Sequence, residues 1–146
     1  MATCLKIGAL AAGAKDEIAN MLYIFGEKLG MSFQIRDDLL DFTQSSQQLG
    51  KPAGSDLRKG QVTLPVLYAL QDSHIAPSIR SISSNTPSSD IDDVIVSIQQ
   101  SDALERTEEL SRHYLDEAME LINQLQQYDA HEDLQTLLHY FSDRSK

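Results

Sequence analysis

Three aspartates lie close together in the segment Asp37-Asp38-Leu39-Leu40-Asp41. On a helix, residues three or four positions apart project from neighbouring turns of one face, so these carboxylates would lie near one another. Like charges held in this way repel, and the helix macrodipole adds to the repulsion near a C-terminal end. A cation would compensate, and Mg²⁺ suits carboxylate oxygens, because it takes one or two carboxylates together with phosphates and waters. From spacing alone, a solvated acidic turn is the more common explanation.

A glycine-rich stretch follows the aspartates, within reach of the helix end. It reads Gly50-Lys51-Pro52-Ala53-Gly54-Ser55-Asp56. Its glycines permit close approach of the backbone to a phosphate, and Lys51 supplies a compact positive charge. The stretch is not a P-loop, because the Gly-Lys-Ser/Thr of that motif is missing. Aspartates with Mg²⁺ on one side and Lys51 on the other would bind a diphosphate, and only this combination favours a binding site over a solvated surface.

Apolar residues recur at three- and four-residue steps before the aspartates, which predicts one helix over residues 15 to 42. Gly26 and Gly30 lie inside it and each cost roughly 1 kcal/mol relative to alanine, which indicates close packing or a nearby ligand. The apolar period stops from Thr43 to Gly60, so we expect a loop there. Loops longer than about 12 to 15 residues are usually functional or disordered.

The rest of the chain also favours helices, because strand signals are poor and aromatic residues make up only 6% of the sequence. We therefore predict an all-α fold with a single helical domain over residues 1–146. The further helices are expected in residues 1–14, from Thr63 to about Leu70 with Thr63 as its cap, from Asp90 to about Gln100, and around Leu104–Leu125 and Leu134–Phe141.

Composition limits the classes of partner. The formal net charge of −10 argues against nucleic acid, because such binding depends on Lys and Arg neutralising phosphates. A single cysteine, Cys4, excludes an internal disulfide and is consistent with a reducing cytosol. No stretch approaches the roughly 20 apolar residues of a spanning helix. We expect a soluble, cytoplasmic protein with no transmembrane segment.

Four stretches together resemble the second aspartate-rich region of the trans-isoprenyl (polyprenyl) diphosphate synthases. They are Phe33-Gln34, Asp37-Asp38-x-x-Asp41, Gly50-Lys51-Pro52-x-Gly54-x-Asp56-Leu57 and Thr63-Leu64-Pro65. The small-residue helix near the start and the C-terminal residues around Tyr140 also resemble this family, so the resemblance covers essentially the whole chain. The sequence from Gly30 to Ile35 is most similar to that of the large catalytic component of bacterial heptaprenyl or hexaprenyl diphosphate synthases, which work with a small partner subunit.

The resemblance implies an all-helical prenyltransferase that depends on Mg²⁺. Its substrates would be an allylic diphosphate and isopentenyl diphosphate, and its product a polyprenyl diphosphate of isoprenoid metabolism. The chemistry would be ionisation of the allylic diphosphate, attack by isopentenyl diphosphate and loss of a proton. The implied partners are a small regulatory subunit and further copies of the chain in a homo- or hetero-oligomer.

Residue by residue, the resemblance assigns Asp37 to direct magnesium coordination, with Asp38 and Asp41 in the same ligand or outer network. Lys51 would contact the allylic diphosphate. These residues form the expected catalytic and metal-binding set.

Phe33 and Gln34 would face the reacting end of the allylic chain, where an aromatic face and an amide dipole stabilise developing positive charge. This chain departs from the family pattern at Gln61, where many relatives carry lysine. Arg58 or Lys59 would be the electrostatic substitute for that lysine.

The first aspartate-rich motif of the family, its isopentenyl-diphosphate-binding basic residues and the Lys-Thr pair expected just before Met1 are absent from the sequence. We therefore expect the C-terminal half of the isoprenoid synthase bundle, inactive alone and dependent on a missing N-terminal half. One alternative is a noncatalytic interaction component of a synthase complex. Another is half of a terpene cyclase, against which the Gly-Lys-Pro and Thr-Leu-Pro motifs argue. Whether an N-terminal partner restores turnover distinguishes the leading interpretation from the first alternative.

Overall fold

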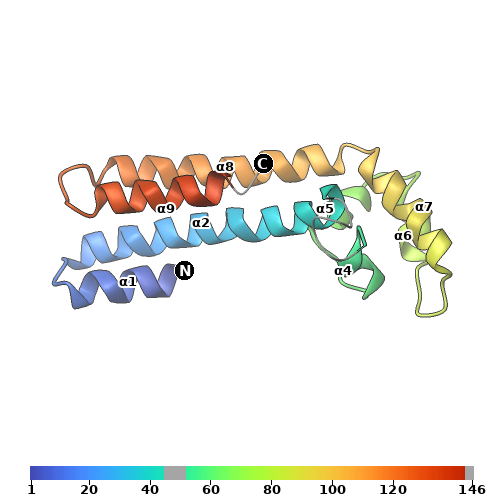
Figure 1. The fold of residues 1–146 in the computed structure, drawn as a ribbon, viewed down its shortest axis with the longest axis horizontal. Helices are drawn as coiled ribbons and strands as arrows, with labels where there is room; N and C mark the ends of the chain where they lie inside the picture. The colour runs from blue at the N-terminus through green and yellow to red at the C-terminus, as the bar shows by residue number, and fades with distance from the viewer. Residues whose placement is uncertain (45–51, 144–146) are drawn as a thin grey trace. The chain divides into compact units, whose positions relative to one another are not determined.

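The computed structural model describes residues 1–44 and 52–143. Every regular element in that part of the chain is a helix, which confirms the all-α prediction (Figure 1). Within the same residues, no helix combines the length and the apolar character needed to cross a membrane. The helices are α1 Ala2–Ala11, α2 Asp16–Thr43, α4 Ser55–Arg58, α5 Leu64–Ala69, α6 Ala76–Arg80, α7 Ser88–Gln99, α8 Ala103–Asn123 and α9 His131–Asp143.

The chain divides into two compact units. The first unit comprises Met1–Gln34 with Leu110–Lys146, and the second comprises Ile35–Glu109. Each unit has a hydrophobic core of its own. The aspartate segment belongs to the second unit.

In the first unit, α1, α9 and the adjoining parts of α2 and α8 run side by side (Figure 1). Apolar residues at three- and four-residue steps on α2, α8 and α9 face inward, as expected for amphipathic helices. Two buried serines join α2 to α8, because the hydroxyl oxygens of Ser32 and Ser111 are 2.9 Å apart. The buried core consists of Phe25, Leu29, Ala118, Ile122, Leu125, Leu134 and Leu138.

Gly26 marks the close approach of α1 to α2. A Cβ atom added at Gly26 would lie 2.8 Å from both the Ala2 Cα and the Leu5 Cδ1, so a larger residue would force the helices apart. At Gly30 the nearest atom to such a Cβ is the Cβ of Met1 at 3.9 Å, an ordinary contact. Close packing, the first of the two explanations expected from the sequence, therefore accounts for Gly26.

The second unit contains the end of α2, the helices α4 to α7 and the start of α8. The sequence predicted an irregular loop from Thr43 to Gly60, and this prediction is wrong for Ser55–Arg58, which forms α4. Residues 45–51 of that stretch lie outside the described residues. A helix of four or five residues is too short to show an apolar period, which is why the sequence did not indicate α4 or α6. The core residues of this unit are Phe42, Leu57, Val66, Ala69, Ile79, Ile91, Val94, Ile95, Ile98 and Ala103.

Candidate active site

The aspartate segment lies in the last turns of α2. That helix runs unbroken from Asp16 to Thr43, as the sequence predicted for residues 15 to 42. The surroundings of its three carboxylates differ sharply: Asp37 is exposed, Asp38 is half-buried and Asp41 is only 1% exposed. Helical spacing brings the three residues to neighbouring turns, and packing then gives each one a separate environment.

Asp41 joins the end of α2 to the glycine-rich stretch. Its Oδ2 accepts a hydrogen bond of 3.1 Å from the backbone N–H of Asp56, and its carbonyl oxygen accepts one of 2.8 Å from Gly54. Asp56 lies in the first turn of α4, where backbone N–H groups lack partners within the helix. The Asp41 carboxylate therefore caps α4 from outside, as an N-cap side chain does from within.

Asp38 makes the equivalent contact with the start of α5. Its Oδ2 accepts a hydrogen bond of 3.3 Å from the backbone N–H of Leu64, the first residue of α5. Thr63 occupies the N-cap position, as predicted, and makes no side-chain cap hydrogen bond within the described residues. Asp38 thus supplies the capping oxygen that the sequence assigned to Thr63.

Helix α7 also reaches this site, which the sequence did not indicate. The side-chain amide of Gln99 donates a hydrogen bond of 2.6 Å to the carbonyl oxygen of Phe42, in the last turn of α2. Ile95 packs against Gly54, where a Cβ would lie 2.5 Å from the Ile95 Cδ1 and the backbone φ is +65°. The sequence predicted a helix from Asp90 to about Gln100, but a helical period does not identify what the helix packs against.

Arg58 is held by contacts within the second unit. Its Nε donates a hydrogen bond of 3.2 Å to the Ala53 carbonyl, and its guanidinium pairs with Asp92 of α7. Lys59 is exposed, with its Nζ 3.9 Å from the Asp56 Oδ1. Of the two cations expected to substitute for a lysine at position 61, Lys59 is therefore better placed to reach a ligand.

Two further predicted site residues, Phe33 and Gln34, belong to the first unit. Phe33 is half-buried in the first unit, where its ring meets the Phe141 ring edge-on, with centroids 5.2 Å apart. Gln34 is exposed and precedes Asp37 by three positions on α2. Lys51 lies outside the described residues.

The donor set fits a metal bound jointly by protein and ligand. Among residues 1–44 and 52–143, no group of three or more His, Cys, Asp or Glu side chains is arranged to hold a metal ion. Asp38 and Asp41 are already engaged with backbone N–H groups, whereas Asp37 presents its carboxylate to solvent. Mg²⁺ needs only one or two protein carboxylates when phosphate and water complete its octahedron, so the residues present fit that ion.

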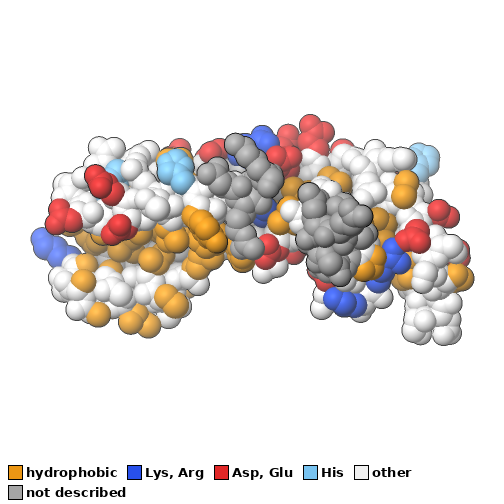
Figure 2. Space-filling model, in the orientation of Figure 1, with side chains coloured by type: hydrophobic (Ala, Val, Ile, Leu, Met, Phe, Trp, Pro, Cys, Tyr) orange, Lys and Arg blue, Asp and Glu red, His pale blue; other side chains and the backbone are white. Residues whose placement is uncertain are grey.

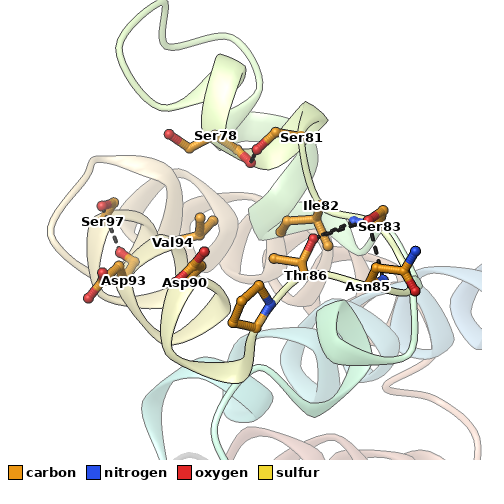
Figure 3. Close-up of a pocket in the computed structure, with 11 residues that line it drawn as sticks. Ser78, Ser81, Ile82, Ser83, Asn85, Thr86, Asp90, Asp93, Val94 and Ser97 are labelled. Atoms are coloured by element: carbon orange, nitrogen blue, oxygen red, sulfur yellow. Dashed lines mark hydrogen bonds between the residues drawn. The ribbon is translucent and has the colours of Figure 1, made fainter.

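A separate polar cavity of about 460 Å³ lies between α6 and α7 (Figure 3). Its hydroxyl groups bond locally: Ser81 donates to the Ser78 carbonyl at 2.8 Å, and Ser97 donates to the Asp93 carbonyl at 2.8 Å. The residues that line it include none of the predicted site residues. It is a feature of the α6–α7 connection and not part of the aspartate site.

The model of the family described as Polyprenyl synthetase matches residues 1–100, a span that contains every predicted site residue and α7. The chain belongs to this family. The resemblance inferred from the aspartate and glycine motifs is thereby confirmed, and the terpene cyclase alternative gains no support.

Solved and curated relatives agree with the family assignment. Heptaprenyl diphosphate synthase component 2 of Geobacillus stearothermophilus is 47% identical over 144 residues, which cover 99% of this chain and 45% of the relative. The heptaprenyl diphosphate synthase of Staphylococcus aureus superposes with a TM-score of 0.89 at 33% identity, covering 97% of this chain and 45% of that one. A geranylgeranyl pyrophosphate synthase of Corynebacterium glutamicum, complexed with calcium and isoprenyl diphosphate, superposes with a TM-score of 0.81 at 30% identity, covering 96% and 44%. This chain therefore spans about half the length of the relatives it matches.

Proposed function

We propose that this chain forms part of the active site of a magnesium-dependent trans-polyprenyl diphosphate synthase, which adds isopentenyl diphosphate to an allylic diphosphate. The observation that carries the proposal is the exposed Asp37 carboxylate at the end of α2, beside two aspartates that secure the following helices. The relatives support it, because their names describe synthases of this class and one was solved with a divalent cation and isoprenyl diphosphate.

Each residue then has a defined role. Asp37 is the direct magnesium ligand, and Asp38 and Asp41 hold α5 and α4 at the rim of the site. When bound, the metal supplies positive charge that stabilises the departing diphosphate. Lys51, three positions before the anchored Gly54, binds the allylic diphosphate.

Phe33 and Gln34 lie one turn before Asp37 along α2. We assign them to the reacting end of the allylic chain, where positive charge develops as the carbon–oxygen bond breaks. The Phe33 ring offers its negative face and Gln34 its side-chain carbonyl dipole. Contact with Phe141 holds the Phe33 ring in one orientation.

The site is incomplete within these 146 residues. The sequence contains one Asp-Asp-x-x-Asp motif, and ionisation of a diphosphate through bound metal requires a second carboxylate cluster of the kind the family carries. The chain alone is accordingly inactive. The name "component 2" of the relative indicates a multi-subunit enzyme, and we assign this chain the same kind of assembly with a second subunit.

A chimera tests this function. This chain replaces the matching segment of the Geobacillus stearothermophilus component 2, and transfer of labelled isopentenyl diphosphate is measured with the second component and Mg²⁺ present. The chimera should turn over substrate, and the chain alone should not. A folded chimera that binds its partner but remains inactive would favour the noncatalytic interaction component instead.

Two substitutions in the chimera then test the residue roles. Asp37→Ala lowers the turnover rate by about 10²-fold or more, the magnitude typical of losing one preorganised electrostatic contact. Asp90→Ala is the matched control, because Asp90 is an exposed aspartate in the first turn of α7. Lys51→Ala chiefly raises the KM for the allylic diphosphate. If Asp37→Ala leaves a folded chimera with nearly full activity, the aspartates are a solvated helix face and the assignment is wrong.

A further inference from the structure

We propose that Gln99 and Asp92 of α7 are positioning residues, which hold the end of α2 and the Ala53–Arg58 stretch together so that the site binds metal and diphosphate in one geometry. The inference rests on the proposed function for its consequence in catalysis. Its structural content, a brace between α7 and the aspartate helix, stands on contacts within the second unit alone.

One face of α7 makes all of these contacts. Asp92, Ile95 and Gln99 are spaced by three and four positions, so they share a face of the helix. The contacts they make lie 34 to 57 positions away in the sequence. A single rigid helix thereby connects two segments that are distant from it along the chain.

Gln99 completes the end of α2. The last carbonyls of a helix lack partners within it, and here the Leu40 carbonyl accepts from Gln44, the Asp41 carbonyl from Gly54 and the Phe42 carbonyl from Gln99. At 2.6 Å the Gln99 contact is short. The residue next to Asp41 is therefore tied directly to α7.

Asp92 and Ile95 contact the glycine-rich stretch. Ile95 fills the space where Gly54 has no side chain, and Asp92 pairs with Arg58, whose Nε bonds the Ala53 carbonyl. The Asp92 side chain is 60% exposed, so its ion pair with Arg58 is screened by solvent and contributes little. The hydrogen bond from Gln99 to Phe42 is partly buried, so Gln99 should matter more than Asp92.

Substitution of Gln99 by glutamate isolates the contact. Gln99→Glu keeps the shape of the side chain, removes the N–H donor and, at neutral pH, places a negative charge against the Phe42 carbonyl. Gln100→Glu is the matched control, because it makes the same change of charge at the adjacent, exposed position. Asp92→Asn and its exposed neighbour Asp93→Asn form a second pair that keeps the test decisive if Gln99→Glu does not fold.

Amide hydrogen exchange of the whole chain without metal is the first measurement. The Gly54 and Asp56 amides, which both bond Asp41, should exchange at least about tenfold faster in Gln99→Glu, with no change at the Leu29 amide in the first unit. Asp92→Asn should give a smaller acceleration at the same amides. Uniform acceleration across both units would mean general destabilisation and would overturn the inference, as would unchanged exchange at Gly54 and Asp56.

The magnesium dependence of the active chimera is the second measurement. Gln99→Glu should raise the Mg²⁺ concentration for half-maximal activity by about tenfold, while Gln100→Glu leaves it unchanged. Loss of folded protein alone would lower the maximal rate without moving that concentration. An unmoved midpoint overturns the inference and leaves the proposed function intact.

Failure of the Asp37→Ala test removes the proposed function, and the exchange experiment still decides whether the brace exists.

Discussion

The same chemical group, a carboxylate, is present in Asp37, Asp38 and Asp41, and the neighbours of each one determine its role. Asp41 is buried and accepts a hydrogen bond from the first turn of α4, Asp38 accepts one from the first residue of α5, and Asp37 faces solvent. A carboxylate that accepts a hydrogen bond from the start of another helix stabilises that helix. A carboxylate left in solvent at the same helix end remains available to a cation.

Stability should separate Asp41 from Asp37. Asp41→Ala removes the cap of α4, which costs about 0.5–2 kcal/mol, and leaves a gap at a residue that is 1% exposed. Asp37→Ala, at an exposed position, should change the free energy of unfolding by no more than about 0.5 kcal/mol. Urea denaturation followed by circular dichroism measures both. Equal losses for the two variants would show that burial of Asp41 has no structural role.

The Lys28–Glu117 pair in the first unit predicts a dependence of stability on pH. The Lys28 Nζ lies 2.9 Å from the Glu117 Oε2, and this hydrogen bond raises the pKa of Lys28 and lowers the pKa of Glu117. A lowered carboxylate pKa adds stability at pH values above the ordinary 4.5, and that stability is lost as the pH falls through the lowered value. The raised pKa of Lys28 adds stability that is lost only above the ordinary 10.5.

Glu117→Gln should therefore lower the melting temperature at pH 7, and the difference from the unsubstituted chain should vanish once the pH is well below 4.5. Thermal denaturation at a series of pH values measures this difference. Glu120→Gln, at an exposed position on the same helix, is the control and should show little change at either pH. A difference that persists undiminished in acid would contradict the ion-pair explanation.

At the scale of the elements, two kinds of contact organise the chain. Amphipathic helices bury continuous stripes, as α2, α8 and α9 do in the first unit. Short helices depend instead on other elements for their ends, since α4 and α5 take capping oxygens from α2. Long helices are thus determined largely by local pattern, whereas α4 and α5 depend on tertiary contacts.

The two interior glycines of α2 provide a matched pair of substitutions. Gly26→Ala should destabilise the chain by about 1–3 kcal/mol, because the added Cβ would lie 2.8 Å from the Ala2 Cα and α1 must shift. Gly30→Ala meets only an ordinary contact and should stabilise it by up to about 1 kcal/mol through helix propensity. Chemical denaturation gives both values. If both variants are stabilised, α1 does not pack as closely as the structure shows.

At the scale of the whole molecule, exposed apolar side chains gather on α1 and α2 (Figure 2). Ile7 is 61% exposed and Leu10 43% on α1, while Ile24 is 42% and Met31 43% exposed on α2. Scattered apolar residues are normal on a surface, but several on adjacent helices favour association.

The isolated chain should self-associate as its concentration rises. Sedimentation velocity should show a shift to larger species, and the double substitution Ile7→Gln with Ile24→Gln should reduce it. Val96→Gln is the control, because Val96 is 46% exposed on α7 in the second unit. A monomer at all concentrations, or an equal effect of Val96→Gln, would show that α1 and α2 do not drive association.

Local pattern alone determined much of this protein. The α2 helix, the amphipathic helices and the start of α5 next to Thr63 follow from the spacing of apolar residues and from residue preferences over a few turns. The aspartate motif with its glycine-rich stretch was also sufficient to indicate the polyprenyl synthetase family. These features are readable because the residues that define each of them are close in the chain.

Only the tertiary structure decided how the three aspartates differ and which other residues support them. Gln99 meets Phe42 across 57 positions, and Asp38 meets Leu64 across 26. A helical period shows that residues share a face but carries no information about the element packed against it. Burial of Asp41, exposure of Asp37 and the contacts of α7 arise from such distant packing, because the chain must fold before those atoms become neighbours.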